Sequence, residues 1–353
     1  MRIILLICLT TLISEKGNGE QLLDLNFNLI GVSGKFYNES IFEEDKRKIL
    51  FFISPHCRYS LKFIEFTGKL HKEGNSDNQE IYLISPNYPQ ALIPDDLSYT
   101  DLDVTIDGMK ELAVRNNLQM PYIYDGENQI LANYFSVNIT PAVVYLGKNN
   151  NLIYKGKIGE ITPTGEIDTS YFEKIIDGDD KQQLIVTKLR GTEVKTKKNL
   201  STTSEVLRRY ANETIRITEA NEDRIAFYLK FHNKKITIFF VWQTSDSECK
   251  ENLLKITEIY KIYRKRGLSL VTICISENAS EAIDILKQTQ SSGHNFYSNF
   301  YETNPIFEMA SMKSKITPTT LALGKQEKIF FKSQKRLNIE KLKSSIIQVL
   351  ENK

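Results

Sequence analysis

The sequence predicts an α/β fold made of two tandem copies of one unit, each a central mixed β-sheet flanked by helices. The first observation is an apolar strand, a turn and an amphipathic helix, which occur around Cys57 and again around Cys249. The second is an Ile-Thr-Pro sequence followed, after four residues, by Leu-Gly-Lys, at 139–148 and again at 316–325. Because both motifs recur in the same order, we interpret the chain as a repeated domain.

The first copy begins around a continuous apolar run at 49–53, which is typical of a strand buried on both faces. Pro55 ends this strand because proline has no N–H to donate to a ladder. Leu61, Phe63 and Ile64 then follow helical spacing. Further along we expect a lead-in strand and turn at 21–33, strands at 81–84 and 152–154, and a short strand ending in a turn at 121–126. A further strand is expected within 137–148, helices at 104–114, 128–135 and from 171 to 176, and a polar surface insertion at 86–100.

The second copy repeats this order after a segment rich in Lys, Thr, Asn and Ser. We expect strands at 235–242, 268–275, 319–325 and 328–331, a helix that opens at Cys249, and a helix at 279–286. The predicted domains are a signal peptide at 1–20, the first copy at 21–186, a linker with one short helix at 187–223, and the second copy at 224–353.

The N-terminus predicts export. Arg2 precedes an apolar run at 3–13, which is too short to span a bilayer and is typical of a secretory signal. The alternative is a buried N-terminal strand. No other segment is long and apolar enough to cross a membrane, so we expect a periplasmic or secreted protein without a membrane span.

Composition excludes several classes of function. Lys and Arg number 46 against 44 Asp and Glu, so there is no basic excess to indicate nucleic-acid binding. The four histidines lack ligand spacing, which argues against a metal site. No glycine-rich phosphate loop and no serine-nucleophile motif is present, and we expect no cofactor.

Cys57 is the candidate nucleophile. It lies where the first strand passes into a helix, and the unpaired N–H groups and dipole of a helix start favour a thiolate there. Arg58 and His56 are its candidate activating neighbours. The alternative is a buried structural cysteine.

A buried strand, a cysteine at a helix start and a later strand entered through Thr-Pro resemble the thioredoxin fold. In that family the proline is cis, its loop lies beside the reactive cysteine, and the preceding residue offers backbone groups to an extended substrate. The resemblance implies that Thr140-Pro141 and Thr317-Pro318 are the substrate-binding loops.

Each copy resembles a different branch of that family. The first is similar to redoxins of the alkyl-hydroperoxide-reductase/thiol-specific-antioxidant group from about Phe27 to Lys195. The motifs that carry this resemblance are His56-Cys57-x-Tyr59, Met109-Lys110-x-x-Ala113, Pro121-Tyr122-x-Tyr124-Asp125, Val137-x-x-Thr140-Pro141, Tyr154-x-Gly156-x-Ile158 and Gly191-Thr192-x-Val194-Lys195. The second resembles thiol-disulfide oxidoreductases through Trp242-x-Thr244.

Both copies depart from the family's dithiol motif. In the first, the resolving-cysteine position holds Ser60. In the second, the nucleophile position holds Asp246, and only Cys249 of the pair remains. Neither copy can close the short disulfide of a dithiol enzyme. A peroxidase is weakly supported, because Leu50 stands where that motif needs proline.

Two hypotheses follow. In the first, Cys57 is a monothiol centre that attacks a disulfide or is oxidised by a peroxide. Ser60 donates a hydrogen bond to the Cys57 thiolate. An external thiol or Cys249 then resolves the product. Its partners would be protein or small-molecule thiols and disulfides. In the second, the pair is non-catalytic and chaperone-like, and it binds extended polypeptide at the two Thr-Pro loops.

Overall fold

The computed structural model describes residues 25–351 except 44, 74–77, 179–182 and 231–234. The predicted signal peptide lies outside the described residues. Contacts divide the chain into two compact units. Unit 1 holds the described residues up to Ser54, Tyr59–Pro86 and Met109–Val194, and unit 2 holds Pro55–Arg58, Asn87–Gly108 and the chain from Lys195 onward.

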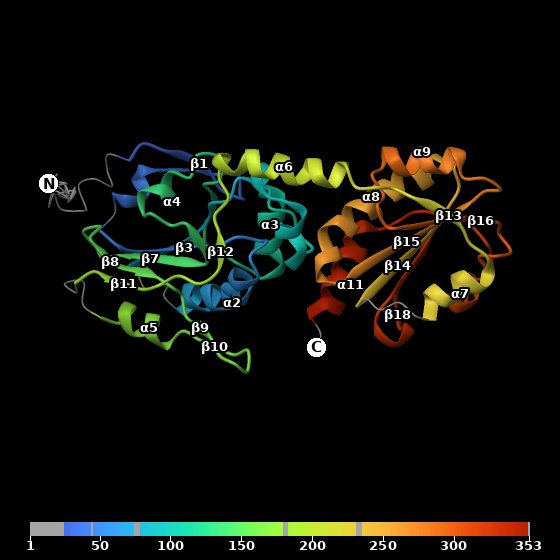
Figure 1. The fold of residues 1–353 in the computed structure, drawn as a ribbon. Coiled ribbons are helices and arrows are strands. Elements are labelled where there is room, and N and C mark those ends of the chain that lie inside the picture. The colour runs from blue at the N-terminus through green and yellow to red at the C-terminus, as the bar shows by residue number, and fades with distance from the viewer. Residues whose placement is uncertain (1–24, 44, 74–77, 179–182, 231–234, 352–353) are drawn as a thin grey trace, which may run out of the picture. The chain divides into compact units, whose positions relative to one another are not determined.

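Unit 1 contains a six-stranded mixed sheet in the order β11-β8-β7-β3-β4-β5 (Figure 1). The central strand β3 (Arg47–Phe52) confirms the strand predicted from the apolar run. It runs parallel to β4 (Gln79–Ser85) and antiparallel to β7 (Ala142–Leu146). The other strands are β5 (Tyr122–Tyr124), β8 (Leu152–Gly156) and β11 (Ile185–Val186).

Alternate residues of β3 pack on opposite faces of this sheet, as the two-residue period of a strand requires. Phe51 contacts Phe66 of α2 (Arg58–Glu73) and Phe172 of α5 (Ser170–Ile176). Phe52 contacts Phe135, which follows α4 (Ile130–Tyr134) on the other face. The remaining elements of the first half are β1 (Asn28–Ile30), β2 (Phe36–Asn38), η1 (Glu39–Phe42), α3 (Ile106–Arg115), β6 (Ile139–Thr140), β9 (Glu160–Ile161), β10 (Ile167–Asp168) and β12 (Thr192–Glu193).

Unit 2 contains a second six-stranded sheet in the order β13-β16-β15-β14-β17-β18. Its central strand β14 (Ile236–Trp242) is parallel to β15 (Leu268–Ile275) and antiparallel to β17 (Thr319–Leu323), as β3 is to β4 and β7. The outer strands are β13 (Ile217–Glu219), β16 (His294–Ser298) and β18 (Ile329–Gln334). The segment 187–223, expected to be a linker, contributes β12, η4 (Lys197–Asn199), α6 (Leu200–Ala211) and β13.

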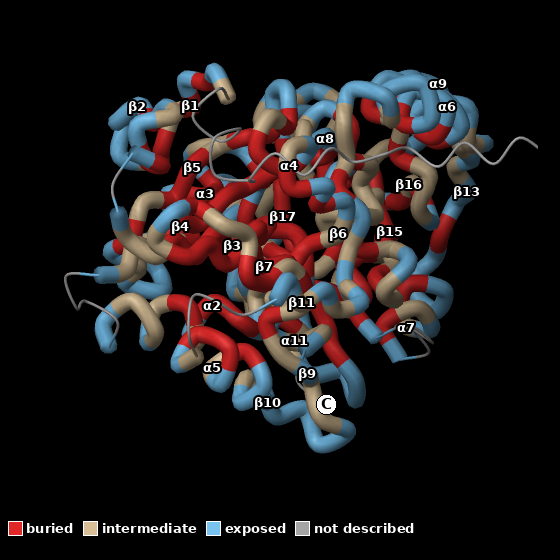
Figure 2. Tube along the Cα trace, turned by 90° about the vertical axis from the view of Figure 1, so that its left-hand side faces the viewer, coloured by how far each residue is buried: buried red, intermediate tan, exposed pale blue. Residues whose placement is uncertain are grey.

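Helices cover both faces of the second sheet. One face packs against α8 (Ser247–Tyr263), α9 (Ser280–Gln288) and α11 (Ile339–Glu351). The other packs against α7 (Glu222–Lys230) and α10 (Asn304–Met309). The short turns η5 (Arg264–Arg266) and η6 (Lys325–Glu327) complete the unit. Figure 2 colours β3 of unit 1 and β17 of unit 2 as buried.

The prediction that residues 86–100 form a polar insertion on the surface is wrong in one respect. From Asn87 onward this segment packs within unit 2 and is partly buried. It forms η2 (Pro89–Ala91) and η3 (Pro94–Tyr99), and Ala91, Ser98 and Thr100 are buried. The hydroxyl of Tyr263 in α8 donates to the Thr100 carbonyl at 2.7 Å. Its polar sequence reflects side chains that bind other parts of the chain, not solvent alone.

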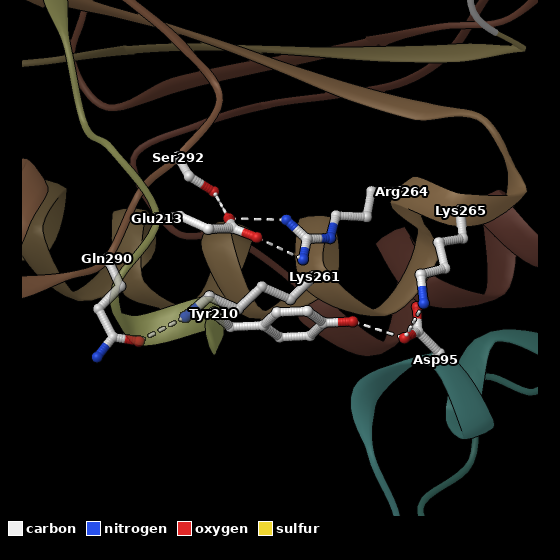
Figure 3. A network of polar contacts seen from close by, with 8 residues as sticks. All are labelled: Asp95, Tyr210, Glu213, Lys261, Arg264, Lys265, Gln290 and Ser292. Atoms are coloured by element: carbon white, nitrogen blue, oxygen red, sulfur yellow. Dashed lines mark hydrogen bonds and ion pairs between the residues drawn. The ribbon is translucent and has the colours of Figure 1, made fainter. Parts of the chain in front are cut away.

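A network of polar contacts fixes η3 in unit 2 (Figure 3). The Asp95 carboxylate accepts from the Tyr210 hydroxyl at 2.5 Å and from Lys265 Nζ at 2.7 Å. The Arg264 guanidinium lies 4.1 Å from the centroid of the Tyr210 ring and pairs with Glu213 at 2.8 Å. Partly buried charges that are paired and stacked in this way hold a defined geometry better than isolated surface pairs.

Among the residues that the structure describes, no helix is long and apolar enough to cross a membrane.

Candidate functional site

Both Thr-Pro loops have the expected geometry. The Thr140-Pro141 and Thr317-Pro318 peptide bonds are cis. Pro141 directly precedes β7, and Pro318 directly precedes β17, the strands that run antiparallel to the two central strands. The two loops therefore hold equivalent places in the two sheets.

Cys57 directly precedes Arg58, the first residue of α2, so it stands at the start of a helix as predicted. Its side chain is fully buried. The guanidinium of Arg58 lies 5.3 Å from the centroid of the Tyr99 ring, a cation–π contact within unit 2. Arg58 thus has a fixed aromatic partner beside the cysteine.

His56 is a neutral imidazole at neutral pH. Burial, and to a smaller extent the nearby charge of Lys195, lower the pKa of His56 to about 4. Only 1% of the side chain is exposed. His56 therefore adds no positive charge next to Cys57, so an activating role would have to come from packing or hydrogen bonding.

Ser60 lies in the first turn of α2, and its hydroxyl oxygen accepts from the Ser54 backbone N–H at 3.2 Å. This bond closes the loop that contains Cys57. The hydroxyl is fully buried. Ser60 therefore holds the resolving position with an oxygen atom, which cannot form a disulfide.

Cys249 holds the corresponding position in unit 2. Its sulfur accepts from the Gln243 backbone N–H at 3.4 Å and donates to Asp246 Oδ2 at 3.5 Å. Burial, and to a smaller extent the negative charge of Asp246, raise the pKa of Cys249 to about 12. Cys249 is a protonated thiol at neutral pH and a poor nucleophile.

Asp246 acts as the N-cap of α8. Its Oδ1 accepts from the Glu248 backbone N–H at 2.8 Å, and its own backbone is extended. A carboxylate here satisfies an orphan donor and complements the helix dipole. Asp246 therefore acts as a capping residue at the start of α8.

The Thr317 hydroxyl lies at the same centre. It donates to Gln243 Oε1 at 3.1 Å, and it lies near enough to Cys249 to offset part of the rise in the pKa of that thiol. The structure thus places Asp246, Cys249 and Thr317 near one another. The backbone N–H and C=O of Thr317 make no hydrogen bond to a described residue, and Thr317 is partly exposed.

The backbone of Thr140 in unit 1, unlike that of Thr317, is paired with another strand of the chain, namely β12. Thr192 lies opposite Thr140 and Glu193 opposite Ile139 in an antiparallel ladder. The Val194 N–H donates to the Asn138 carbonyl at 2.9 Å. The late Gly-Thr motif was noted in the sequence, but no local pattern indicated which strand it would pair with.

Cys274 is a third free cysteine among the described residues. It lies in β15 opposite Trp242, and its sulfur accepts from the Thr244 backbone N–H. Burial raises the pKa of Cys274 to about 12. It is a second buried, protonated thiol in unit 2. Among the described residues, no group of three or more His, Cys, Asp or Glu side chains could hold a metal ion.

Comparison with known proteins gives only distant similarities. No protein-family model and no curated protein matches the chain. A hypothetical protein of Sinorhizobium meliloti is 18% identical over 48% of this chain and 91% of its own, with a TM-score of 0.42. An uncharacterized protein of Geobacillus kaustophilus is 20% identical over 49% and 89%, with a TM-score of 0.39. A secreted disulfide oxidoreductase of Mycobacterium tuberculosis is 13% identical over 45% and 98%, with a TM-score of 0.33.

The fold itself is plain from the structure. Each unit has a six-stranded mixed sheet flanked by helices, the same order of strands around its central strand, and a cis-proline before the neighbouring antiparallel strand. The chain is therefore α/β, with two mixed sheets of matching strand arrangement.

Proposed function

We propose that Cys57 is the monothiol centre of a thioredoxin-fold protein that carries out thiol–disulfide exchange. The observation that carries this proposal is the position of Cys57, which directly precedes the 16-residue helix α2. The N-terminal N–H groups of a helix stabilise a thiolate. Ser60 in the resolving position supports single-thiol chemistry.

In the proposed reaction the Cys57 thiolate attacks one sulfur of a substrate disulfide. A mixed disulfide forms with that half, and the other half leaves as a thiolate that takes a proton from solvent. A second thiolate, from an external thiol, then attacks the mixed disulfide and releases Cys57. The raised pKa of Cys249 favours an external thiol over Cys249 in this step.

Reaction of the folded protein with oxidised glutathione tests this proposal. We expect a glutathione adduct on Cys57, located by peptide mass mapping, at a rate above that of the unfolded chain at pH 6. Cys57→Ser should remove the adduct, whereas Cys274→Ala should keep it, because Cys274 is buried with a raised pKa. An adduct that forms only after unfolding would contradict the proposal.

A second function, binding of extended polypeptide, is favoured for unit 2 by one observation. The backbone of Thr317 has no hydrogen-bond partner among the described residues. The neighbouring Cys249 thiol is protonated at neutral pH, because its pKa is raised to about 12. A strand of a bound polypeptide could pair with such an edge.

Thr317→Pro, which removes the backbone donor, should weaken binding of a fluorescent unfolded polypeptide by about tenfold, since a lost backbone bond costs on the order of 1–2 kcal/mol. Thr317→Val keeps the N–H and is the matched control. Equal affinities of the two variants would exclude this edge as the binding site.

The proposed chemistry suits an oxidising compartment, and the predicted signal at 1–20 supports export. N-terminal sequencing of protein recovered from the source culture tests this point. A chain that still starts at Met1 would contradict cleavage of a signal.

A further inference from the structure

The chain contains five Asn-x-Ser/Thr sequences, the pattern that accepts asparagine-linked glycans. Their asparagines are Asn38, Asn138, Asn199, Asn212 and Asn278. So short a pattern also arises by chance, and the sequence alone does not select among the five. A glycan is bulky and hydrated, so it fits only a surface amide whose nitrogen makes no bond that the fold needs. The folded structure therefore distinguishes the five asparagines.

Asn38 and Asn278 share one local geometry. Asn38 Oδ1 accepts from the Ser40 backbone N–H at 3.2 Å and from the Ser40 hydroxyl at 2.6 Å. Asn278 Oδ1 accepts from the Ser280 backbone N–H at 3.1 Å and from the Ser280 hydroxyl at 2.9 Å. In both places the amide and the hydroxyl two residues later form one compact turn. The two groups that define the pattern are therefore already side by side.

These two turns lie on the surface of their own units. Both asparagines and both serines are exposed. Asn38 is the last residue of β2 in unit 1, and Asn278 lies between the end of β15 and the start of α9 in unit 2. The amide oxygens make the contacts of the turns, and neither amide nitrogen donates to a described residue. A substituent on either nitrogen therefore breaks no hydrogen bond within the described part of the chain.

Two of the other sequences are tied into the fold. Asn199 Oδ1 accepts from the Thr196 backbone N–H at 2.8 Å, and the residues after Asn199 belong to α6. The hydroxyl residue that follows Asn138 is Thr140, which is fully buried and paired with β12. Modification of either asparagine therefore requires that a cap or a strand pair first be opened.

The sequence at Asn212 has an exposed asparagine but a fixed middle residue. Glu213 pairs with Arg264 at 2.8 Å, and the Ser292 hydroxyl donates to the same carboxylate. An enzyme that binds all three residues must first break this partly buried ion pair. The sequence at Asn212 is therefore a poorer acceptor than the two exposed turns.

We propose that Asn38 and Asn278 are sites of asparagine-linked glycosylation, in preference to the other three asparagines. In the reaction the amide Nδ2 forms a bond to the anomeric carbon of an oligosaccharide carried on a lipid diphosphate. The bond between that carbon and the diphosphate breaks, and the amide loses one proton as the diphosphate leaves. An oligosaccharide transferase of the secretory route supplies the donor and the catalysis. The proposal rests on the predicted export of the chain and not on the reactivity of Cys57.

Mass mapping of the full chain, expressed in a secreting eukaryotic host, tests the proposal. Removal of glycans by peptide-N-glycosidase in water enriched in heavy oxygen leaves a labelled aspartate wherever a glycan was attached. We expect the label at Asn38 and Asn278 and its absence at Asn199. Ser40→Ala and Ser280→Ala should each cause the loss of one glycan, because they remove the hydroxyl and keep the asparagine. Ser40→Thr and Ser280→Thr keep a hydroxyl and are the matched controls.

The possible failures are distinguishable. A secreted chain without label at Asn38 and Asn278, or with equal label at Asn199, would overturn the proposal. If the chain stays in the cell, a host signal sequence placed before it restores entry to the secretory route. Label at both asparagines then supports the two sites and contradicts the predicted signal. Glycans at both sites in a protein whose Cys57 forms no glutathione adduct would support the sites and contradict the proposed thiol exchange.

Discussion

The Gln243 backbone N–H donates to the sulfur of Cys249, six residues later, at 3.4 Å. In unit 1 the Ser54 N–H makes the same contact with the Ser60 hydroxyl, also six residues later, at 3.2 Å. Each bond closes the loop between a central strand and its following helix. Ser60 and Cys249 therefore hold one structural position in the two units, and the chemistry of the units differs because the atoms there differ.

Ser60→Cys is predicted to restore a dithiol motif at the start of α2. The new sulfur would take the place of the hydroxyl, three residues after Cys57, a spacing that allows the short loop of a redox disulfide. After treatment with oxidised glutathione we expect an internal disulfide, detected as the loss of two hydrogens by mass spectrometry. Ser60→Ala is the control and should accumulate the glutathione adduct instead. Two thiols that both stay reduced would show that the positions are not equivalent.

Asp246→Ala is predicted to destabilise unit 2 by about 1 kcal/mol, the usual cost of losing an N-cap. Asp246→Asn keeps the acceptor for the Glu248 N–H and should cost less. Neither change should make Cys249 react in the folded protein, because burial is the larger cause of its raised pKa. Urea unfolding measures the change in stability, and alkylation located by peptide mass mapping measures the reactivity of Cys249. Equal destabilisation by Asp246→Ala and Asp246→Asn would argue against a capping role of Asp246.

The His56 imidazole predicts a pH dependence of stability. The pKa of His56 is lower in the folded state, so the unfolded state binds the proton more strongly. The stabilisation is full above about pH 6.5 and is lost as the pH falls toward about 4, by up to about 3 kcal/mol. His56→Gln should remove this component, measured as the difference in urea midpoint between pH 7 and pH 4.5.

The comparison must be made between wild type and variant, because Asp125 acts in the opposite direction. Burial raises the pKa of Asp125 to about 7, so its protonation stabilises the folded state as the pH falls. The difference between the two proteins isolates His56. An identical pH dependence in both would mean that His56 is not buried as a neutral group.

The two central strands were predictable from sequence, because a strand buried on both faces is a continuous apolar run in any context. The runs at 49–53 and 235–242 correspond to β3 and β14, and Thr140-Pro141 and Thr317-Pro318 have the expected cis bonds. These features depend on a few adjacent residues, so a single sequence contains them.

The pairing of Thr192 with Thr140 and the burial of η3 could not be predicted in the same way. Each depends on contacts between residues far apart in the chain, and β12 is too short to show an alternating pattern. The polar segment from Pro86 looked like a surface loop because its buried groups, such as the Thr100 carbonyl, bind partners such as Tyr263. The neutral state of His56 follows from burial, which the sequence does not specify.

Tyr263→Phe is predicted to loosen the segment Asn87–Gly108 within unit 2. The Tyr263 hydroxyl donates to the Thr100 carbonyl at 2.7 Å in a buried position, and its loss leaves that carbonyl without this donor. The expected cost is about 1–2 kcal/mol, with faster hydrogen exchange in η3. Tyr260→Phe is the control, because the Tyr260 hydroxyl makes no hydrogen bond to a described residue. The Tyr260 ring lies 5.7 Å from the Arg264 guanidinium, and this contact is kept in the Phe variant. If both variants exchange η3 amides at the wild-type rate, the hydroxyl bond does not hold the segment, and the charged network around Asp95 must do so instead.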